Sequence, residues 1–317
     1  MVFSQQNQPS KADSMARSFV LWLHGLGDSG PANEPIKTVF TSPEFRNTVW
    51  SFPSAPFNPV TCNNGAVMPS WFDIHEMPVT ADSPKDESSV LKAVQNVHAM
   101  IDKEIAAGTA PNNVFVCGLS QGGFPLALAL QHLPPSPLSF SPPNAHTPSA
   151  LALASVLLYP KTLGGGAVFS GWVPFNSSII QRIPPNAKRI LWRVNKSGVD
   201  LNLLIGCSEV VLDGSKSLTE TSCMHSVLMI GTDYSGDKGQ CFLFARDYPC
   251  KRTPVLWCHG TEDRTVLFEA GQAGPPFLEQ AGVSCEFKAY PGLGHTITTE
   301  ELKYLESWIK TRMQSSS

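Results

Sequence analysis

Short, almost wholly apolar segments alternate along this chain with segments of helical pattern, and that alternation restricts the fold most strongly. Five of the segments have the composition of buried strands: "FVLWL" at 19–23, "VFVCG" at 114–118, "GAVFSGW" at 166–172, "PVLWCHG" at 254–260 and "CEFKAY" at 285–290. Strands that are apolar on both faces occur where helices cover both sides of a parallel sheet. We therefore predict the α/β class, with a mostly parallel sheet, helices on both of its faces and minor antiparallel additions.

Two amphipathic helices are predicted with particular clarity. The first begins after Asp86 and stops at Gly108, because apolar residues recur between them at spacings of three and four: Val90, Val94, Val97, Ile101 and Ile105. The second begins near Thr299 and places four apolar residues on one side: Leu302, Leu305, Trp308 and Ile309. Both helices can therefore cover the predicted sheet.

Two stretches interrupt this order. Residues 124–149 contain seven prolines, each of which removes an amide donor and restricts its neighbour, and residues 190–252 show no persuasive periodicity. A structureless stretch of that size argues against a place in the core. We predict one domain over 16–311, interrupted by these two irregular insertions, with disordered tails at 1–15 and 312–317.

Composition excludes several classes of partner. The chain of 317 residues is 42% hydrophobic and 15% charged, which is enough to bury a full core. Its net charge is −3 and no block of basic residues interleaved with aromatic residues occurs, so no nucleic-acid partner is expected. The first fourteen residues are polar, and no later apolar run has the length of a membrane span. We expect a protein of the cytosol, and of the nucleus as well, without stable membrane insertion.

Cysteine usage points to reduced thiols and not to a disulfide or metal framework. The eight cysteines are scattered, and they form no CxxC pair and no zinc spacing. No metal site is therefore expected. Oligomeric state stays open, because no heptad pattern can be found.

"GLSQG" at 118–122 fits the G-x-S-x-G motif, and its surroundings suit that motif. A strand precedes it and a segment with helical capacity follows, so a tight turn can lift the Ser120 hydroxyl clear of the sheet. A structural serine in a glycine-rich turn would give the same motif, so a catalytic role for Ser120 also requires a base, an acid and oxyanion donors.

A serine hydroxyl becomes a nucleophile only beside a base that is held in one tautomer by an acid. His295, in the glycine-rich "YPGLGHTI", is the best candidate base, and Asp263, in "HGTEDRTV", directly follows the strand "PVLWC". Glu262 and Asp233 are competing acids, and Glu262 should point away from Asp263 if the segment is extended. Four other histidines are interpreted as structural: His98, His132, His146 and His225.

Ester cleavage also requires two backbone amides that stabilise an oxyanion. One belongs to the residue after the nucleophile, here Gln121, and the other to a loop after an early strand. "LHGLGDSG" at 23–30 is such a loop, with Leu26 as the expected donor. The spacing of a P-loop or a dinucleotide fingerprint is missing from it.

Together, six motifs resemble the acyl-protein thioesterase and carboxylesterase family of α/β hydrolases, and most closely its plant carboxylesterase branch. They are "LHGLGDSGPANEP", "FPSAPFNPVTCNNGAVMPSWFDI", "DESSVLKAVQNVHAMIDKEIAAG", "GLSQGG", "CHGTEDRTV" and "YPGLGH". The resemblance covers roughly 16–123, 150–189 and 253–311. It implies an enzyme that hydrolyses esters or thioesters through an acyl-enzyme, with neither metal nor organic cofactor.

Position by position, the resemblance implies Ser120 as nucleophile, His295 as base, Asp263 as orienting acid, and the amides of Leu26 and Gln121 as oxyanion donors. It also places Trp71 beside the site and makes the segment from His75 to Val79, with Met77, a wall or lid over an acyl tunnel. Core packing is an equal alternative for Trp71 and Met77. Members of the plant branch are associated with short acyl groups, including acetyl groups on proteins, so the expected substrate is an acylated protein or a small ester or thioester.

The two irregular stretches fall where the family pattern is interrupted. Without them, Gly123 would join "ALALASVLLYP" and Arg189 would join "TPVLWCHG". Two segments, "LALALQHL" and "ALALASVLL", compete for the position of the helix after the nucleophile. The sequence leaves a serine hydrolase, a non-catalytic receptor on the same fold and an inactive splice form as alternatives, and Met15 is a second candidate start. Retention of all five site groups favours the enzyme.

Overall fold

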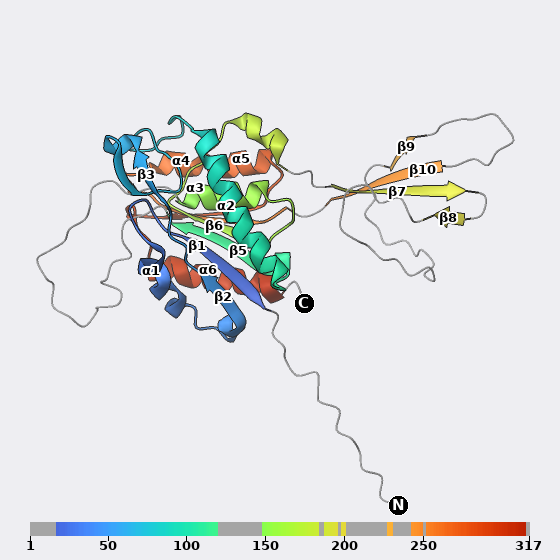
Figure 1. The fold of residues 1–317 in the computed structure, drawn as a ribbon, viewed down its shortest axis with the longest axis horizontal. Helices are drawn as coiled ribbons and strands as arrows, with labels where there is room; N and C mark the ends of the chain where they lie inside the picture. The colour runs from blue at the N-terminus through green and yellow to red at the C-terminus, as the bar shows by residue number, and fades with distance from the viewer. Residues whose placement is uncertain are drawn as a thin grey trace, which may run out of the picture. The chain divides into compact units, whose positions relative to one another are not determined.

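The computed structural model describes residues 17–119, 148–183, 187–195, 198–200, 227–230, 242–249 and 252–314 (Figure 1). The chain divides into two compact units, the first formed by Met1–Pro184 with Arg252–Ser317 and the second by Pro185–Lys251.

The first unit is built on a parallel sheet of six strands in the order β12-β11-β6-β5-β1-β2 (Figure 1). Every neighbouring pair is parallel. The strands are β1 (Ser18–Leu23), β2 (Thr48–Ser51), β5 (Val114–Leu119), β6 (Gly165–Phe169), β11 (Val255–Gly260) and β12 (Cys285–Tyr290). A separate antiparallel pair is formed by β3 (Phe57–Val60) and β4 (Ala66–Pro69). The predicted class and the predicted strands are confirmed.

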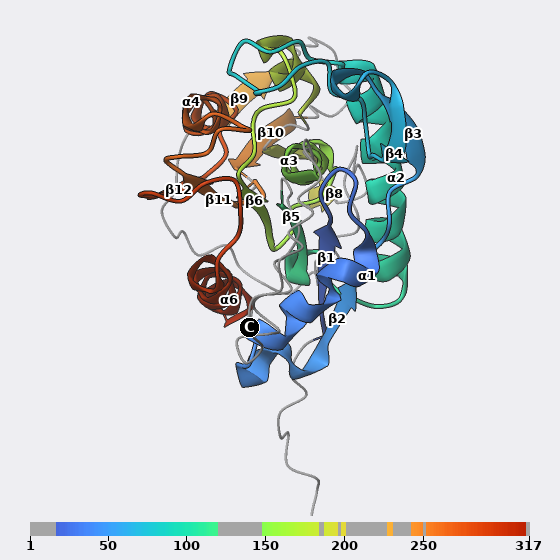
Figure 2. The same ribbon diagram turned by 90° about the vertical axis from the view of Figure 1, so that its left-hand side faces the viewer.

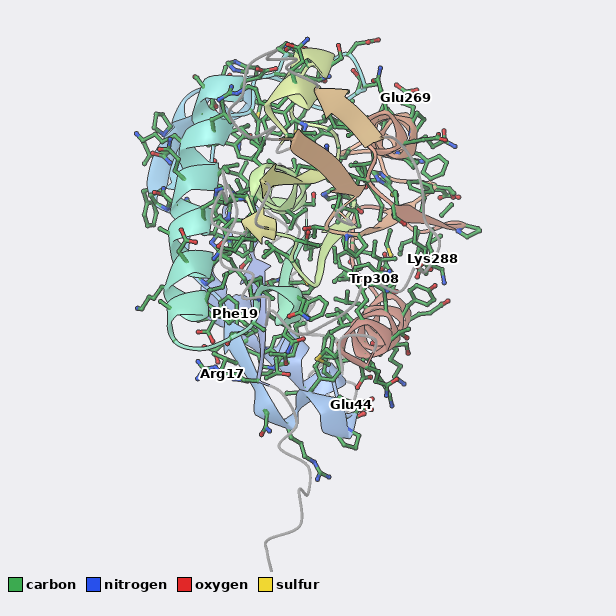
Figure 3. The ribbon with its side chains drawn as sticks, turned by 90° about the vertical axis from the view of Figure 1, so that its right-hand side faces the viewer. Arg17, Phe19, Glu44, Glu269, Lys288 and Trp308 are labelled. Atoms are coloured by element: carbon green, nitrogen blue, oxygen red, sulfur yellow. The ribbon has the colours of Figure 1, made fainter. Side chains whose placement is uncertain are left out.

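Alternate residues of each buried strand face two different hydrophobic cores. In β1, Phe19 belongs to the core that α2 and α3 cover, and Trp22 belongs to the core that α6 covers. Figure 2 shows α2 and α6 on either side of β1 and β5. Trp308 of α6 lies over Gly165 of β6, where a Cβ atom would come within 2.4 Å of the indole (Figure 3). Burial on both faces explains why these strands have no polar alternation.

The helices follow the predicted signals. In α2 (Glu87–Ala106), the Asp86 carboxylate caps the first turn by accepting from Ser89 N at 3.2 Å, and Gly108 has a φ of +105° after the last turn. The second predicted helix, α6 (Thr299–Gln314), continues into the region where the sequence suggested a disordered tail. The other α-helices are α1 (Gly30–Asn33), α3 (Pro148–Leu158), α4 (Phe268–Gln272) and α5 (Gly274–Gln280). Short 3₁₀ turns occupy Glu34–Val39, Pro43–Asn47, Thr61–Asn63, Pro111–Asn113 and Ser177–Arg182.

The competition between two helical segments is decided in favour of the second. "ALALASVLL" forms α3, which packs on β5 and β6, and its residues Ala150–Ala154 are fully buried. "LALALQHL" lies outside the described residues. Of the irregular stretch predicted at 124–149, only Pro148 and Ser149 are described, and they begin α3.

The second unit contains an antiparallel sheet of four strands in the order β8-β7-β10-β9. These are β7 (Ala187–Asn195), β8 (Gly198–Asp200), β9 (Val227–Ile230) and β10 (Phe242–Pro249). The sequence analysis expected no regular element over 190–252, and the structure differs on this point. The longest pairing joins Ala187 to Pro249, so its partners are far apart in the sequence and no short hairpin turn marks them.

The start of α6 carries a buried acid. Glu301 is 1% exposed, and its carboxylate accepts hydrogen bonds from Thr298 N at 2.8 Å and Thr298 Oγ1 at 3.0 Å. The Glu301 amide donates in return to Thr298 Oγ1, which completes a reciprocal cap. Burial raises the pKa of Glu301 from 4.5 to about 7. Because the folded state favours the protonated acid, its contribution to stability is complete below pH 4.5 and is lost as the pH rises through 7.

Glu301→Gln should therefore stabilise the fold in alkaline but not in acidic buffer. Glutamine keeps an oxygen for Thr298 but cannot ionise, so we expect the free energy of unfolding to rise by roughly 1–3 kcal/mol above pH 7 and to change little near pH 4.5. Thermal denaturation of wild type and variant at both pH values measures this. The exposed neighbour Glu300, changed to glutamine, is the matched control. An equal gain at both pH values would contradict the assignment.

Candidate active site

The candidate site residues follow the carboxyl ends of different strands. Leu26 follows β1, Asp263 follows β11 and His295 follows β12. Since the sheet is parallel, these ends share one edge. The chain also reverses its winding between β1 and β5, because β2 lies on one side of β1 and β5 on the other. Such a switch point is where open α/β sheets bind ligands.

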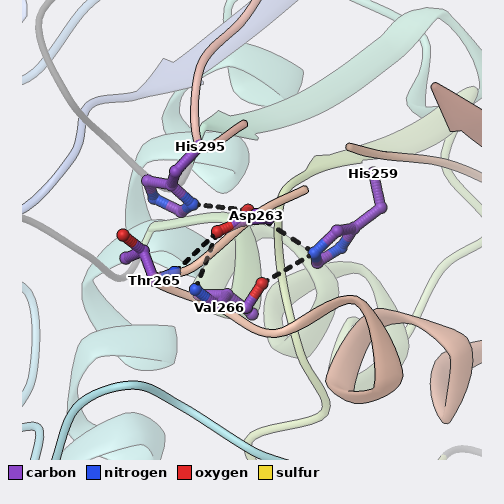
Figure 4. Close-up of polar contacts among 5 residues, drawn as sticks. All are labelled: His259, Asp263, Thr265, Val266 and His295. Atoms are coloured by element: carbon purple, nitrogen blue, oxygen red, sulfur yellow. Dashed lines mark hydrogen bonds and ion pairs between the residues drawn. The ribbon is translucent and has the colours of Figure 1, made fainter. Parts of the chain in front are cut away.

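Asp263 and His295 are joined directly. His295 Nδ1 donates to Asp263 Oδ2 at 2.6 Å, across 32 residues of sequence (Figure 4). The other oxygen of Asp263 accepts from Thr265 N at 2.9 Å and Val266 N at 3.0 Å, so the carboxylate is fixed by its own turn. With the proton on Nδ1, the lone pair of His295 lies on Nε2, which is the atom that a general base uses.

The charge of Asp263 is maintained although its side chain is buried. Burial alone would raise the pKa of this carboxyl group. The hydrogen bond and positive field of His295, together with the Thr265 amide, outweigh burial and hold the pKa below its ordinary value. Asp263 is therefore an anion at neutral pH. The competing acid Glu262 is exposed, and Asp233 lies outside the described residues.

The loop after β1 forms a tight turn whose first central residue is Leu26. Asp28 N donates to Gly25 O at 3.1 Å, and Gly27 has a φ of +73°, which favours glycine at that position. Gly27 N donates to Pro69 O at 2.8 Å. Within the part of the chain that the structure describes, the Leu26 amide donates to no acceptor. An unused amide in a fixed turn is what an oxyanion donor requires.

His24 holds this turn and is a residue that the sequence analysis did not single out. The ring is fully buried, and Nδ1 donates to Gly25 O at 2.7 Å while Nε2 accepts from Ala55 N at 2.8 Å. Burial lowers the pKa of His24, so the ring stays neutral, as its acceptor role demands. The only available signal was its place in "LHGLGDSG", directly before the predicted donor loop.

Trp71, which follows β4, supports the same turn by contacting His24. Its indole N–H donates to His24 O at 3.0 Å, and its ring centroid lies 5.4 Å from that of His24. The side chain is buried in the core between the sheet and α2. Packing thus accounts for Trp71 as far as the described contacts go, and a substrate role for it stays a prediction.

The predicted lid is attached to the turn that follows Asp263. Val79 N donates to Thr265 O at 2.8 Å, and Leu267 N donates to Val79 O at 2.9 Å. Val79 is 1% exposed, whereas Met77 is half-buried against the core. A small pocket of about 20 Å³ is lined by Val79 and Trp172 on its apolar side and by charged side chains such as Glu76 and Lys85 elsewhere.

A larger cavity of about 210 Å³ lies beside this pocket, with Trp172 and Lys85 in the wall of both. Most of its lining is apolar: Ala81, Trp172, Val173, Phe175, Ala270 and Phe277. These residues come from the segments that follow Val79, β6 and Asp263. The apolar part of this wall suits a hydrocarbon group.

Ser120 and Gln121 lie outside the described residues. The described chain reaches Leu119, the last residue of β5, which pairs with Phe169 at the end of β6. The predicted nucleophile therefore directly follows a strand that ends at the same edge as β1 and β11. Whether its hydroxyl meets His295 stays a prediction.

Neither a metal cluster nor a membrane-spanning helix is found in the described segments. No group of three or more histidine, cysteine or acidic side chains is arranged there to hold a metal ion. No helix in those segments combines the length and the apolar character that a bilayer crossing needs.

Comparison with known proteins assigns the family. A family model described as Phospholipase/Carboxylesterase matches residues 8–139 and 244–313. Probable carboxylesterase SOBER1-like of Arabidopsis thaliana is 54% identical over 305 residues, which covers 96% of this chain and 82% of the relative. Acyl-protein thioesterase 1 of Cryptococcus neoformans is 26% identical over 304 residues, covering 92% and 90%.

A solved structure agrees with this assignment. The crystal structure of Arabidopsis thaliana SOBER1 superposes with a TM-score of 0.65 at 51% identity, covering 94% of this chain and all of that one. The parallel sheet and the covering helices are in keeping with it. The chain belongs to the phospholipase/carboxylesterase family of α/β hydrolases.

Proposed function

We propose that this ester hydrolase of the carboxylesterase and acyl-protein thioesterase kind works through a serine acyl-enzyme in which Ser120, His295 and Asp263 act as a triad. The observation that carries the proposal is the 2.6 Å hydrogen bond from His295 Nδ1 to the buried carboxylate of Asp263. It fixes the tautomer in which Nε2 can accept a proton. The bond lies at the sheet edge where β5 ends, and Ser120 is the next residue.

In the proposed reaction, Ser120 Oγ attacks the acyl carbon while His295 Nε2 takes the hydroxyl proton. The carbonyl oxygen becomes an oxyanion, which the amides of Leu26 and Gln121 stabilise. When the intermediate collapses, the bond to the thiol or alcohol breaks and His295 gives that leaving group the proton. Water then attacks the acyl-enzyme by the same route, releasing the acid and restoring Ser120. No step calls for a metal or an organic cofactor.

The acyl group is proposed to enter the mostly apolar cavity near the turn after Asp263, with the small pocket at Val79 beside it. The larger cavity, lined by Trp172, Ala270 and Phe277, offers mostly apolar surface, whereas the small pocket under Val79 has polar and charged side chains in its wall as well. The proposed substrate is therefore an acylated protein or a small ester or thioester with a hydrocarbon acyl group. Met77 and Val79 would form part of the wall.

Turnover of nitrophenyl esters of increasing chain length, beside an acyl thioester, tests this function. We expect a burst of nitrophenol equal to about one acyl-enzyme per chain, followed by slower steady release. The series also measures the preferred acyl length. A well-folded chain that releases no product from any ester would contradict the proposal and favour a receptor or an inactive form.

Val79→Phe should shift the preference towards shorter acyl groups. The larger ring would fill the small pocket in which Val79 is 1% exposed. We expect kcat/KM for the longest accepted ester to fall about 10-fold or more relative to acetate, because each methylene in an apolar pocket contributes that order of discrimination. Val67→Phe, at a position 65% exposed, is the control for an added ring. Unchanged selectivity would remove Val79 from the acyl site.

Residues 124–149 and 190–252 are proposed to be insertions that the hydrolase does not need. The helix α3 formed by "ALALASVLL" packs on β5, and the described residues of the first unit form two hydrophobic cores. The family model leaves 140–243 unmatched, an interval that overlaps both stretches without coinciding with either. These observations favour a chain in which Gly123 joins Ala150 and Arg189 joins Thr253.

Deleting both stretches should therefore increase soluble yield and ester turnover per chain. The shortened protein keeps all six strands of the parallel sheet and loses β8, β9, β10 and the part of β7 from residue 190 onward. Yield, melting temperature and kcat of the two proteins are compared directly. A shortened chain that is neither more soluble nor more active would show that the stretches contribute to the fold or the site.

A further inference from the structure

His259 is a second histidine beside the carboxylate of Asp263. It is the penultimate residue of β11 and is fully buried. Its Nε2 lies 2.9 Å from Val266 O and 3.5 Å from Asp263 Oδ2 (Figure 4). The Oδ2 atom is the same oxygen that accepts from His295.

The contacts of the ring define its tautomer. A carbonyl oxygen only accepts, so the hydrogen bond to Val266 O places the proton on Nε2. Nδ1 has no hydrogen-bond partner among the described residues and faces Gly271 of α4, where a Cβ atom would lie 2.2 Å away. Phe268 packs edge-on against the ring with centroids 5.8 Å apart. His259 therefore has one orientation available.

The turn that carries Asp263 depends on this ring. Val266 donates its N–H to Asp263 Oδ1 and accepts the His259 proton at its C=O, so both sides of this residue are fixed. Loss of the His259 bond would free the carbonyl of Val266, and with it the amide that orients Asp263. The ring thus acts on the carboxylate both through the turn and directly at Oδ2.

We propose that His259 is a positioning residue, which holds Asp263 in the orientation that His295 requires by donating its Nε2 proton to Val266 O and towards Asp263 Oδ2. This inference rests on the proposed function, in which Asp263 is the acid that orients the catalytic base His295. A role as a second base is excluded by geometry, because the ring is fully buried and its unprotonated Nδ1 faces Gly271 of α4.

The charge state of the ring agrees with this role. Burial lowers the pKa of His259, so the imidazole stays neutral. The ionisable groups that act on it are Asp263, which favours the charged ring, and His295, which opposes it. A neutral ring donates one proton and leaves the negative charge of Asp263 for His295.

His259→Leu and His259→Gln form the test, measured with a nitrophenyl ester as probe. Leucine removes the donor, and we expect kcat to fall on the order of 10- to 100-fold with KM changed less than about twofold. Glutamine carries an amide nitrogen at the position of Nε2, so it should restore at least about half of that loss on a logarithmic scale. The leucine variant should also move the acid limb of kcat/KM to higher pH, because Asp263 without its second donor stabilises protonated His295 more strongly.

Gly271→Ala is an independent perturbation that retains the histidine. Its Cβ must displace the ring, so we expect the same loss of kcat and the same shift of the acid limb, in a helix that alanine otherwise favours. His98→Gln is the control, since His98 also bonds a backbone carbonyl through Nε2, at 2.9 Å from Ser155 O, but lies on α2.

The outcomes separate this inference from the proposed function. If His259→Leu lowers only the melting temperature and leaves kcat and the acid limb as in wild type, His259 is merely structural and the inference is overturned. If that variant fails to fold, an unchanged acid limb in Gly271→Ala overturns it equally. Activity that survives Ser120→Ala would instead overturn the proposed function.

Discussion

Ser120→Ala is expected to lower kcat for nitrophenyl ester hydrolysis by about 10⁴- to 10⁶-fold while the protein stays folded. Alanine removes the oxygen that would form the acyl-enzyme, and the burst of product should vanish with it. The remaining rate would come from the oxyanion turn and from binding alone. Steady-state and burst kinetics, beside circular dichroism of both proteins, measure the effect.

Ser170→Ala is the matched control for this loss. Ser170 follows β6 at the same edge of the sheet, is buried and precedes Gly171, but it belongs to no proposed step. We expect its replacement to change kcat by less than about 10-fold. Equal losses in the two variants would mean that Ser120 is not the nucleophile.

Asp263→Asn should produce the second largest effect, a fall in kcat of about 10⁴-fold with little change in KM. The amides of Thr265 and Val266 donate to one oxygen of the carboxylate, so the asparagine carbonyl must keep that place. Its NH₂ group then faces His295 Nδ1, which in the wild type carries a proton and donates it to Asp263 Oδ2. Two donors would then face each other. His295 can bond to this NH₂ group only by moving its own proton to Nε2, and that tautomer cannot accept from a serine.

The melting temperature of Asp263→Asn distinguishes a wrong tautomer of His295, which leaves it unchanged, from damage to the fold, which lowers it. Glu262→Gln is the control, because Glu262 precedes Asp263 directly and is exposed. It should retain kcat within about twofold. An Asp263→Asn variant that kept most of its activity would show that His295 needs no buried anion.

The strands that are apolar on both faces could be predicted from the sequence, because burial on both sides leaves an uninterrupted hydrophobic run. The sequence was insufficient for β2, which is half-buried along its whole length, and for β3, which carries Phe57 at 72% exposure. Such segments lack the run and have no other strong period. In the second unit, the pairing of β7 with β10 was missed because its partners are distant in the sequence, and β8, which pairs with β7 from Gly198 onward, is only three residues long.

For the site, the sequence predicted Asp263 and His295 as partners, and the structure places them in a hydrogen bond. The two buried histidines were missed. His24 and His259 each end or follow a strand and bond to backbone carbonyls, so their roles depend on neighbours that spacing does not reveal. Trp71 was predicted beside the site, and its indole bonds to His24 O, while a substrate role for it stays a prediction.

The mass and position of a fluorophosphonate adduct test the central claim most directly. The probe reacts with a serine only where a base and an oxyanion site activate the hydroxyl. For the folded chain, the account predicts one phosphonate per molecule, found by peptide mass spectrometry on Ser120 and absent from His295→Ala. A folded chain that stays unlabelled, or carries its adduct on another serine, would contradict it.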